Sequence, residues 1–379
     1  MYLDNAATAK YTNIDDIIVD TMTTAMRDSW LNPSSLYAAN VKNKIDKCRE
    51  NIANFINAKS EEIIFTSGAS ESNNMAIRGW VDNLWEIGNV ITSTIEHKSI
   101  VNLVQSNILE ARVYDCKVDK HGIIDYQDLN TYLSYYKYIP TLVSIHMANN
   151  ELGVIQDIKR ISEMVHRHYD GILHVDATQA LPYIPIDVEA LGIDMLSASG
   201  HKISPVLKGI GFLYKRNGVN IKPLIYGAQE NNLRGGTENT FGIIGLSKAI
   251  EYCDTTIQIT ESLCGKRDYF IDRLVKKFGC KLNGHATNRL PNNVNVTFPQ
   301  DITGEGLLYL LDMSDIKCST GSACNSHDIQ MSHVLEAIGL TKEDAMKTVR
   351  FTLPNDITHQ DIDKVIDEIE KAITLIEIN

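Results

Sequence analysis

The sequence lacks several features that mark common classes of protein. It contains no apolar run of about 18 residues, so we expect no membrane-spanning helix. Its first residues, Met1 to Asn5, show no basic stretch followed by an apolar one, which argues against a secretory signal. The seven cysteines include no Cys-x-x-Cys pair, so neither a disulfide framework nor a zinc ribbon is expected. These absences favour a cytoplasmic protein with no metal site and no membrane partner.

The chain also has little clustered positive charge. Its formal net charge is −12, and no dense group of Lys and Arg stands out along its 379 residues. Direct binding of nucleic acid is therefore not expected, because phosphate contacts need clustered cations. No Gly-x-Gly-x-x-Gly motif occurs, which argues against a nicotinamide-dependent dehydrogenase.

What the sequence does contain is a regular alternation of short apolar segments and amphipathic ones. Helical periodicity is found at residues 15–30, 40–56, 71–80, 99–109 and 158–169. Strand-like apolar segments are found at residues 62–66, 89–93, 112–115, 141–145, 172–176, 193–196 and 211–214. This alternation predicts an α/β fold with a large, mainly parallel seven-stranded sheet covered by helices on both faces.

The pattern changes after about residue 237. A long helical stretch runs to about residue 277 without an intervening strand, and we expect it to connect two domains. The remainder predicts a smaller α+β domain, with strands near 294–298, 316–319 and 348–353 and helices near 305–311, 331–338 and 362–376. The expected division is a large domain of residues 15–255 and a small domain of residues 1–14 and 256–379.

Polar side chains follow five of the predicted strands. Residues 67–70, Ser-Gly-Ala-Ser, precede a helix and form a possible anion site, although an ordinary helix cap at Ser70 is the alternative. The other strand ends carry His97, Asn150, Asp176 and Lys202. Because the carboxyl ends of parallel strands meet at one edge of a sheet, we expect these groups to surround a ligand there.

This set of groups is suited to pyridoxal phosphate. Lys202 follows the buried segment 193–196, where partial desolvation would make its amine able to form a Schiff base. A lysine at a strand end is otherwise an ordinary surface residue. An acid such as Asp176 would keep the pyridine nitrogen protonated, and the cofactor would act as the electron sink.

The segment from Cys318 to Asp328 consists mainly of small polar residues and predicts a loop. Cys324 lies within it, and an exposed thiol there suits a nucleophile that accepts sulfur and passes it on. The alternative is a free cysteine without a role. Cys318 ends a predicted strand and is expected to be buried, and the helical cysteines Cys48, Cys253 and Cys264 are expected to be inert.

Seven short motifs, taken together, resemble those of one family. They are Thr66–Ser72, Glu96–Lys98, Asn149–Gly153, His174–Gln179, Ser199–Lys202, Arg234–Thr237 and Gly321–Cys324. The sequence resembles the cysteine desulfurases of the NifS/IscS type, group I, which are class-V aminotransferases of pyridoxal-phosphate fold type I. The resemblance extends over nearly the whole chain, from Tyr2 to Phe351.

The resemblance implies a cofactor role for each matching residue. Lys202 would hold pyridoxal phosphate as an imine and move protons, while Asp176 would pair with the pyridine nitrogen. The remaining ring contacts would come from Gln179 at the ring hydroxyl, from Asn150, and from His97, which would stack on the ring. The phosphate would be held by Ala69, Ser70, Ser199 and His201, with Thr237 supplied by the other subunit of a homodimer.

The resemblance also implies the reaction. Arg350, with Asn150 and Asn32 beside it, would bind the carboxylate of L-cysteine. Cys324 would take the sulfur as a persulfide, leaving L-alanine, and would pass it to an acceptor protein that serves iron–sulfur clusters, tRNA thiolation or DNA phosphorothioation. Three segments depart from the family pattern, at residues 203–208, 226–230 and 353–356.

Three other functions remain open from the sequence. A selenocysteine lyase would use the same thiol and cofactor. Another pyridoxal-phosphate lyase or an aminotransferase would share the fold but would not need Cys324. A non-catalytic subunit that only binds a partner would be expected to have lost at least one of Lys202, Asp176, His97, Arg350 and Cys324.

Overall fold

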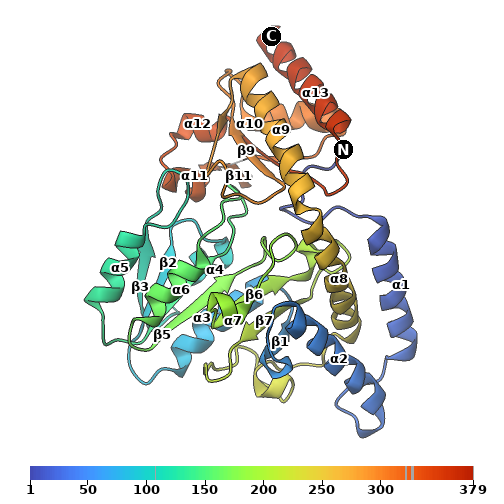
Figure 1. The fold of residues 1–379 in the computed structure, drawn as a ribbon, viewed down its shortest axis with the longest axis vertical. Coiled ribbons are helices and arrows are strands. Elements are labelled where there is room, and N and C mark those ends of the chain that lie inside the picture. Colours follow the sequence, from blue (N-terminus) through green and yellow to red (C-terminus); the bar gives the residue numbers. More distant parts are fainter. Residues whose placement is uncertain (107, 321, 326–327, 379) are drawn as a thin grey trace.

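The computed structural model describes residues 1–106, 108–320, 322–325 and 328–378. A larger α/β part carries a smaller α+β part, and both chain ends lie in the smaller one (Figure 1). Helices α8 (Thr240–Gln258) and α9 (Thr260–Phe278) join the two parts and contain no strand between them, as the sequence predicts.

The larger part is built on one sheet of seven strands. Its spatial order is β1-β7-β6-β5-β4-β2-β3, and β7 alone runs against its neighbours, so the predicted mainly parallel sheet is confirmed. The strands are β1 (Ile63–Thr66), β2 (Asn89–Ser93), β3 (Arg112–Cys116), β4 (Thr141–His146), β5 (Gly171–Asp176), β6 (Met195–Ser199) and β7 (Gly211–Lys215).

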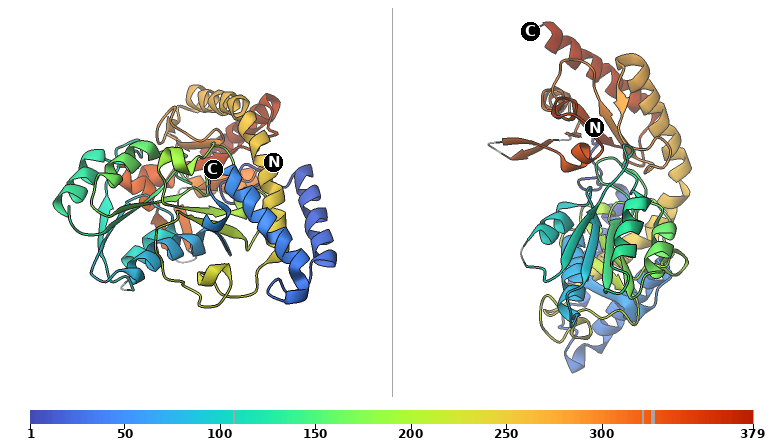
Figure 2. Two further views of the ribbon diagram at one scale, coloured as in Figure 1. Left: turned by 60° about the horizontal axis from the view of Figure 1, so that its bottom comes forward. Right: turned by 90° about the vertical axis from the view of Figure 1, so that its left-hand side faces the viewer.

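Helices cover both faces of this sheet (Figure 2). Successive residues of one strand belong to different hydrophobic clusters, because side chains alternate across a strand. On β2, for example, Ile91 packs into one cluster and Val90 into the other. The helices are α1 (Asn13–Asp28), α2 (Ala39–Phe55), α3 (Ala69–Asn83), α4 (Lys98–Gln105), α5 (Tyr126–Tyr135), α6 (Ile158–His166) and α7 (Val188–Leu191).

The smaller part has its own sheet, with the order β10-β13-β9-β8, and its own hydrophobic cluster. Leu3 belongs to that cluster, so the first residues of the chain pack with the last third. The elements are β8 (Lys281–Leu282), β9 (Asn293–Thr297), α10 (Gly304–Met313), β10 (Ser319–Thr320), α11 (His333–Ala337), α12 (Lys342–Met346), β13 (Thr348–Thr352) and α13 (His359–Ile378).

The predicted loop around Cys324 contains a hairpin. Strand β11 (Ser322–Asn325) pairs antiparallel with β12 (Asp328–Met331), and the backbone of Cys324 lies opposite that of Ile329. The hairpin extends away from the smaller part (Figure 2, right). The expectation of a loop was wrong for these strands, because backbone pairing leaves no periodic signal among small polar side chains.

Smaller differences concern element ends and short helices. The strand expected at residues 193–196 is β6, which begins and ends later, because Ile193 and Asp194 are engaged in a polar network instead. The sequence analysis did not anticipate α5, α7, α12 or β8. None of the described helices combines the length and hydropathy needed to cross a bilayer.

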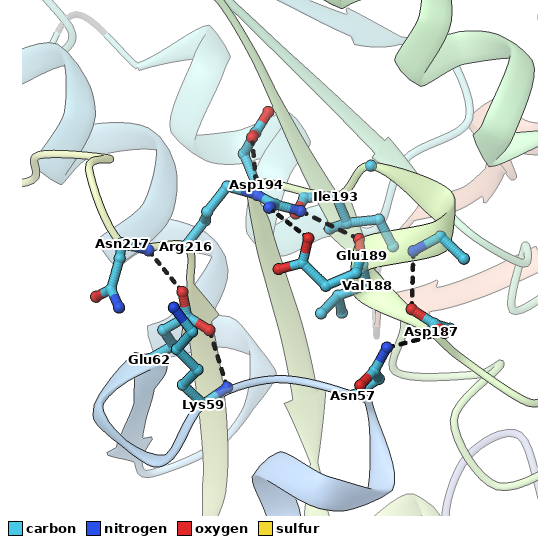
Figure 3. A network of polar contacts seen from close by, with 12 residues as sticks. Asn57, Lys59, Glu62, Asp187, Val188, Glu189, Ile193, Asp194, Arg216 and Asn217 are labelled. Atoms are coloured by element: carbon cyan, nitrogen blue, oxygen red, sulfur yellow. Dashed lines mark hydrogen bonds and ion pairs between the residues drawn. The ribbon is translucent and has the colours of Figure 1, made fainter.

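That polar network closes the sheet at the amino end of β6 (Figure 3). Arg216 follows β7, donates to the carbonyls of Ile193 (3.0 Å) and Val188 (3.3 Å), and pairs with Glu189 at 2.8 Å. Asp194 lies 3.4 Å from Arg216 and accepts a bond from the backbone of β5. These contacts fix three segments at the edge opposite the strand carboxyl ends.

Replacing Arg216 by Ala should therefore lower stability without altering the opposite edge. We expect the free energy of unfolding to fall by about 1–3 kcal/mol, because several backbone carbonyls lose their donor. Urea denaturation measures this change. Arg78→Ala is the matched control, since its pair with Asp82 is exposed and an exposed pair contributes about 0–1 kcal/mol. Equal effects of the two substitutions would contradict the assignment.

Candidate active site

A cavity of about 690 Å³ opens at the carboxyl ends of the parallel strands. This is the edge at which ligands bind in open α/β sheets. Most residues predicted for the site line this one cavity. They are Ala69, Ser70, His97, Asn150, Asp176, Gln179, Ser199, His201, Lys202 and Arg350.

One end of the cavity is formed by the amino terminus of α3. Gly68 caps this helix with φ +147°, a conformation that other residues rarely adopt. A Cβ on Gly211 would lie 2.7 Å from the Cα of Gly68, so a glycine in β7 is what allows the helix to approach the sheet so closely. The first N–H groups of the helix, at Ala69 and Ser70, thus lie at the cavity beside Ser199, where they can bind an anion.

Asp176 supplies a buried carboxylate at the end of β5. Only 5% of its surface is exposed. Its Oδ1 accepts a hydrogen bond from the backbone of Thr178 (3.0 Å), and its Oδ2 accepts one from Asn73 Nδ2 (2.8 Å). Both bonds are donated to the carboxylate and fix its orientation at the end of β5. Asn73 was not predicted, and only its contact in the fold reveals it.

A hydrogen-bonded chain connects Asp176 to His97. The Nδ2 group of Asn73 also donates to Ser99 Oγ (2.9 Å), which in turn lies 2.8 Å from His97 Nδ1. His97 caps α4 and accepts a further bond from the backbone N–H of Ser99 (3.1 Å) at the same nitrogen. These contacts make Nδ1 the acceptor and fix the orientation of the imidazole over the cavity.

Lys202 lies at the turn after β6, and its amine is held by the N-terminal arm. Nζ donates to the carbonyls of Ala6 (2.6 Å) and Ala7 (2.7 Å). Burial, together with the positive charge of Arg350, lowers the pKa of Lys202 to about 8, against the opposing influence of Asp176 and Asp4. About a tenth of this amine is therefore neutral, and able to attack a carbonyl, at pH 7, far more than of a hydrated lysine.

His201 is a neutral neighbour of this amine. Burial, with the nearby charges of Lys202 and Lys208, lowers its pKa to about 4. Its Nδ1 lies 3.1 Å from Thr8 Oγ1. When Thr8 donates this bond, Nε2 carries the proton and can donate to a ligand in the cavity.

Arg350 enters the cavity from β13 of the smaller part. Its Nη2 pairs with Asp4 at 2.7 Å and its Nη1 donates to the carbonyl of Asn150 at 3.0 Å. Its Nε is buried and has no hydrogen-bond partner among the described residues. A guanidinium with an unpaired donor at a cavity is suited to a carboxylate ligand.

Two predicted residues are not brought to this cavity, because Asn32 and Thr237 are exposed and do not line it. The backbone of Cys324 belongs to β11, while its side chain lies outside the described part of the structure. By contrast, the prediction for Cys318 is confirmed, because it is buried and burial raises the pKa of its thiol to about 12.

The sequence analysis missed two groups of cavity residues. The first is the N-terminal arm, whose residues Ala6 and Ala7 line the cavity and hold Lys202, while the Ala6 carbonyl also accepts from Gln179 (3.0 Å). Small residues carry no signal for this role because their backbone performs it. The second is His146, the last residue of β4, which directly follows the predicted strand 141–145 but was given no role.

A family model of class-V aminotransferases matches residues 1–365. The chain therefore belongs to the class-V aminotransferase family. It is 41% identical over 382 residues to the cysteine desulfurase IscS of Dictyoglomus turgidum, covering 98% of this chain and 94% of that relative. It is also 41% identical over 383 residues to IscS of Methanosarcina thermophila, covering 98% and 92%.

Solved structures agree with these relatives. A NifS-like protein superimposes with a TM-score of 0.89 at 30% identity, covering 99% of both chains. The structure of SspA in complex with cysteine matches with a TM-score of 0.78 at 36% identity, covering 93% of this chain and 99% of that one. The chain is thus a cysteine desulfurase of the NifS/IscS type, a pyridoxal-phosphate enzyme, which confirms the predicted family, fold class and cofactor.

The cavity suits this cofactor. The helix terminus at Ala69 offers N–H donors to a phosphate, Asp176 offers a carboxylate to a protonated pyridine nitrogen, and Lys202 offers a partly neutral amine to an aldehyde. The phosphate, the pyridine nitrogen and the aldehyde of pyridoxal phosphate therefore each have a matching partner in one cavity.

The depressed pKa of Lys202 predicts how cofactor loading depends on pH. We expect the rate at which the apoprotein takes up pyridoxal phosphate to rise through an inflection near pH 8, because only the neutral amine reacts. Stopped-flow absorbance measures it. Arg350→Leu should move the inflection to higher pH, since it removes a charge that lowers this pKa, whereas Arg350→Lys should keep it. An unchanged inflection in Arg350→Leu would refute the stated cause.

Proposed function

We propose that this cysteine desulfurase uses Lys202 to bind pyridoxal phosphate covalently and Cys324 to accept sulfur from L-cysteine. The observation that carries the assignment of Lys202 is its position. A partly desolvated amine lies in the same cavity as the Asp176 carboxylate and the anion-binding terminus of α3. When bound, the cofactor supplies an electron sink that weakens the Cβ–S bond of the substrate.

The protein groups around the cofactor divide the remaining work. Asp176, held by hydrogen bonds from Asn73 and Thr178, would pair with the protonated pyridine nitrogen. His97, oriented by Ser99, lies against the ring face, and Gln179 and Asn150 bind the ring substituents. The phosphate is held at the α3 terminus by Ala69 and Ser70, with Ser199 and His201.

Arg350 recognises the carboxylate of the substrate. Its Nε lacks a partner, and its pair with Asp4 keeps the guanidinium in place at the cavity before substrate arrives. Because Asp4 is itself a carboxylate, the substrate shares the guanidinium with it or displaces it. Lys202, whose amine lies beside the carbonyls of Ala6 and Ala7, would move protons at the reacting carbon.

The transfer of sulfur needs only one protein thiol as the acceptor. The Cβ–S bond of L-cysteine breaks, the Cys324 thiolate bonds to that sulfur, and a proton is delivered to the carbon, so that L-alanine and an enzyme persulfide result. No further oxidant or reductant is required. The hairpin that carries Cys324 extends from the smaller part, which suits a thiol that presents its persulfide to an acceptor protein.

We place the remaining site residues at a homodimer interface. Thr237 and Asn32 are exposed in one chain, and in a dimer they would be available to a neighbouring site or to its entrance. We also propose that the two domains divide at about residue 255, close to the junction of α8 and α9 at Gln258. The acceptor is a protein of an iron–sulfur, tRNA-thiolation or DNA-phosphorothioation pathway.

Substitution of Cys324 tests the transfer step. Cys324→Ala should keep the yellow absorption of the bound cofactor but should release less than about 1% of the parent's alanine and sulfide from L-cysteine, because no thiolate accepts the sulfur. Cys264→Ala, which removes a partly exposed thiol on α9, is the control and should release both products at the parent rate. Alanine release that does not depend on Cys324 would show a different lyase.

Substitution of Lys202 tests the cofactor anchor. Lys202→Ala should lose the yellow absorption band and all turnover, since no amine remains to hold the aldehyde. Absorption spectra after incubation with pyridoxal phosphate measure this loss. Lys208→Ala removes an exposed amine that also lines the cavity, and it should retain the band. A band that persists in Lys202→Ala would show that another lysine binds the cofactor.

A further inference from the structure

The cavity contains a buried histidine that the proposed function does not use. His146 ends β4, and only 5% of its side chain is exposed. Its Cα is the register partner of that of Asp176 on the adjacent parallel strand, and both residues line the cavity. The two side chains therefore enter the cofactor site next to each other, because partners in a parallel register lie on the same face of the sheet.

One nitrogen of this imidazole is firmly held. Nδ1 lies 3.0 Å from Oε1 of Glu96, whose side chain is fully buried. The other oxygen of Glu96 accepts the backbone N–H of His146 at 2.9 Å, and Ser93 Oγ bonds to the same carboxylate. Glu96 thus fixes the position of the ring and leaves Nε2 as the nitrogen without a protein partner among the described residues.

The other nitrogen is unsatisfied. Nε2 of His146 is buried and has no hydrogen-bond partner among the described residues. A buried polar atom without a partner costs about 1–3 kcal/mol, so native structures rarely leave one unless a ligand or water completes it. His146 lines the cavity, and its orientation is fixed by Glu96. Its Nε2 is therefore available to donate a hydrogen bond to a ligand.

We propose that His146 is a further cofactor-binding residue, which donates a hydrogen bond from Nε2 to bound pyridoxal phosphate beside Asp176. The pyridine ring offers two acceptors, its nitrogen and its hydroxyl oxygen. Asp176 pairs with the protonated nitrogen, so the hydroxyl oxygen, which can accept a second hydrogen bond beside that from Gln179, is the acceptor for His146. This proposal rests on the assignment of Lys202 and Asp176 in the proposed function.

The charge of His146 follows from its two neighbouring carboxylates. Burial alone would lower its pKa, but the pair with Glu96, and to a smaller extent the charge of Asp176, raise the pKa above its usual value. When protonated, His146 would disfavour a further proton on the bound cofactor, because like charges repel. In that form His146 would lower the pH at which the Lys202-bound cofactor loses its proton.

Two substitutions separate the donor from the charge. His146→Met removes both, and we expect the dissociation constant of pyridoxal phosphate to rise about tenfold and the pH midpoint of the visible absorption band to rise by about one unit. His146→Gln keeps an N–H donor but carries no charge. It should shift the midpoint by a similar amount while holding the dissociation constant within about threefold of the parent.

His174→Gln is the matched control. His174 is also buried and lies two residues before Asp176, but Ser144 (2.8 Å) and Ser197 (2.9 Å) occupy both of its nitrogens, and it does not line the cavity. Burial lowers its pKa to about 4, so its replacement removes no charge, and neither quantity should move.

The outcomes are distinct. A His146→Met protein that binds the cofactor and titrates as the parent does would overturn the proposal, as would a His174→Gln protein that shifts as much as His146→Met. If His146→Met does not fold, the pH midpoint and the dissociation constant measured for His146→Gln test the proposal instead. A parent protein without a visible band on addition of pyridoxal phosphate would refute the assignment of Lys202 instead, independently of His146.

Discussion

The desolvation of one amine is the constraint on which the rest of this structure depends. The amine of Lys202 is held in a partly buried position because it donates hydrogen bonds to the backbone carbonyls of Ala6 and Ala7. The same burial, with Arg350 nearby, lowers its pKa to about 8. A fully hydrated lysine would be charged and unreactive at neutral pH, so the N-terminal arm and the small sheet both contribute to its chemistry.

The two edges of the large sheet serve different purposes. At the amino end of β6, Arg216 and its acceptors satisfy one another and leave no cavity-facing donor (Figure 3). At the carboxyl ends, by contrast, Arg350 Nε and His146 Nε2 are buried without partners among the described residues. Buried polar groups are normally paired, and these two atoms belong to residues that line the cavity, where a ligand can complete them.

Most of the fold and much of the site could be predicted from the sequence, because both depend on strand ends. The apolar segments located the seven strands, and polar residues directly after them, such as His97 and Asp176, fell in one cavity. Asn73 could not be found in this way, since it lies inside a helix and acts through a contact 103 residues away. Ala6 and Ala7 act through their backbone, which no side-chain pattern reveals.

The first residues of the chain link the two parts of the molecule. Leu3 is packed in the core of the smaller part, and the bridges from Tyr2 to Lys317 and from Asp4 to Thr352 extend its sheets. Three residues beyond Leu3, the carbonyl of Ala6 accepts the proton of Lys202. A rotation of the smaller part against the large sheet would therefore pull directly on the groups that solvate the reactive amine. The N-terminal arm would thus couple the position of the smaller part to the basicity of Lys202.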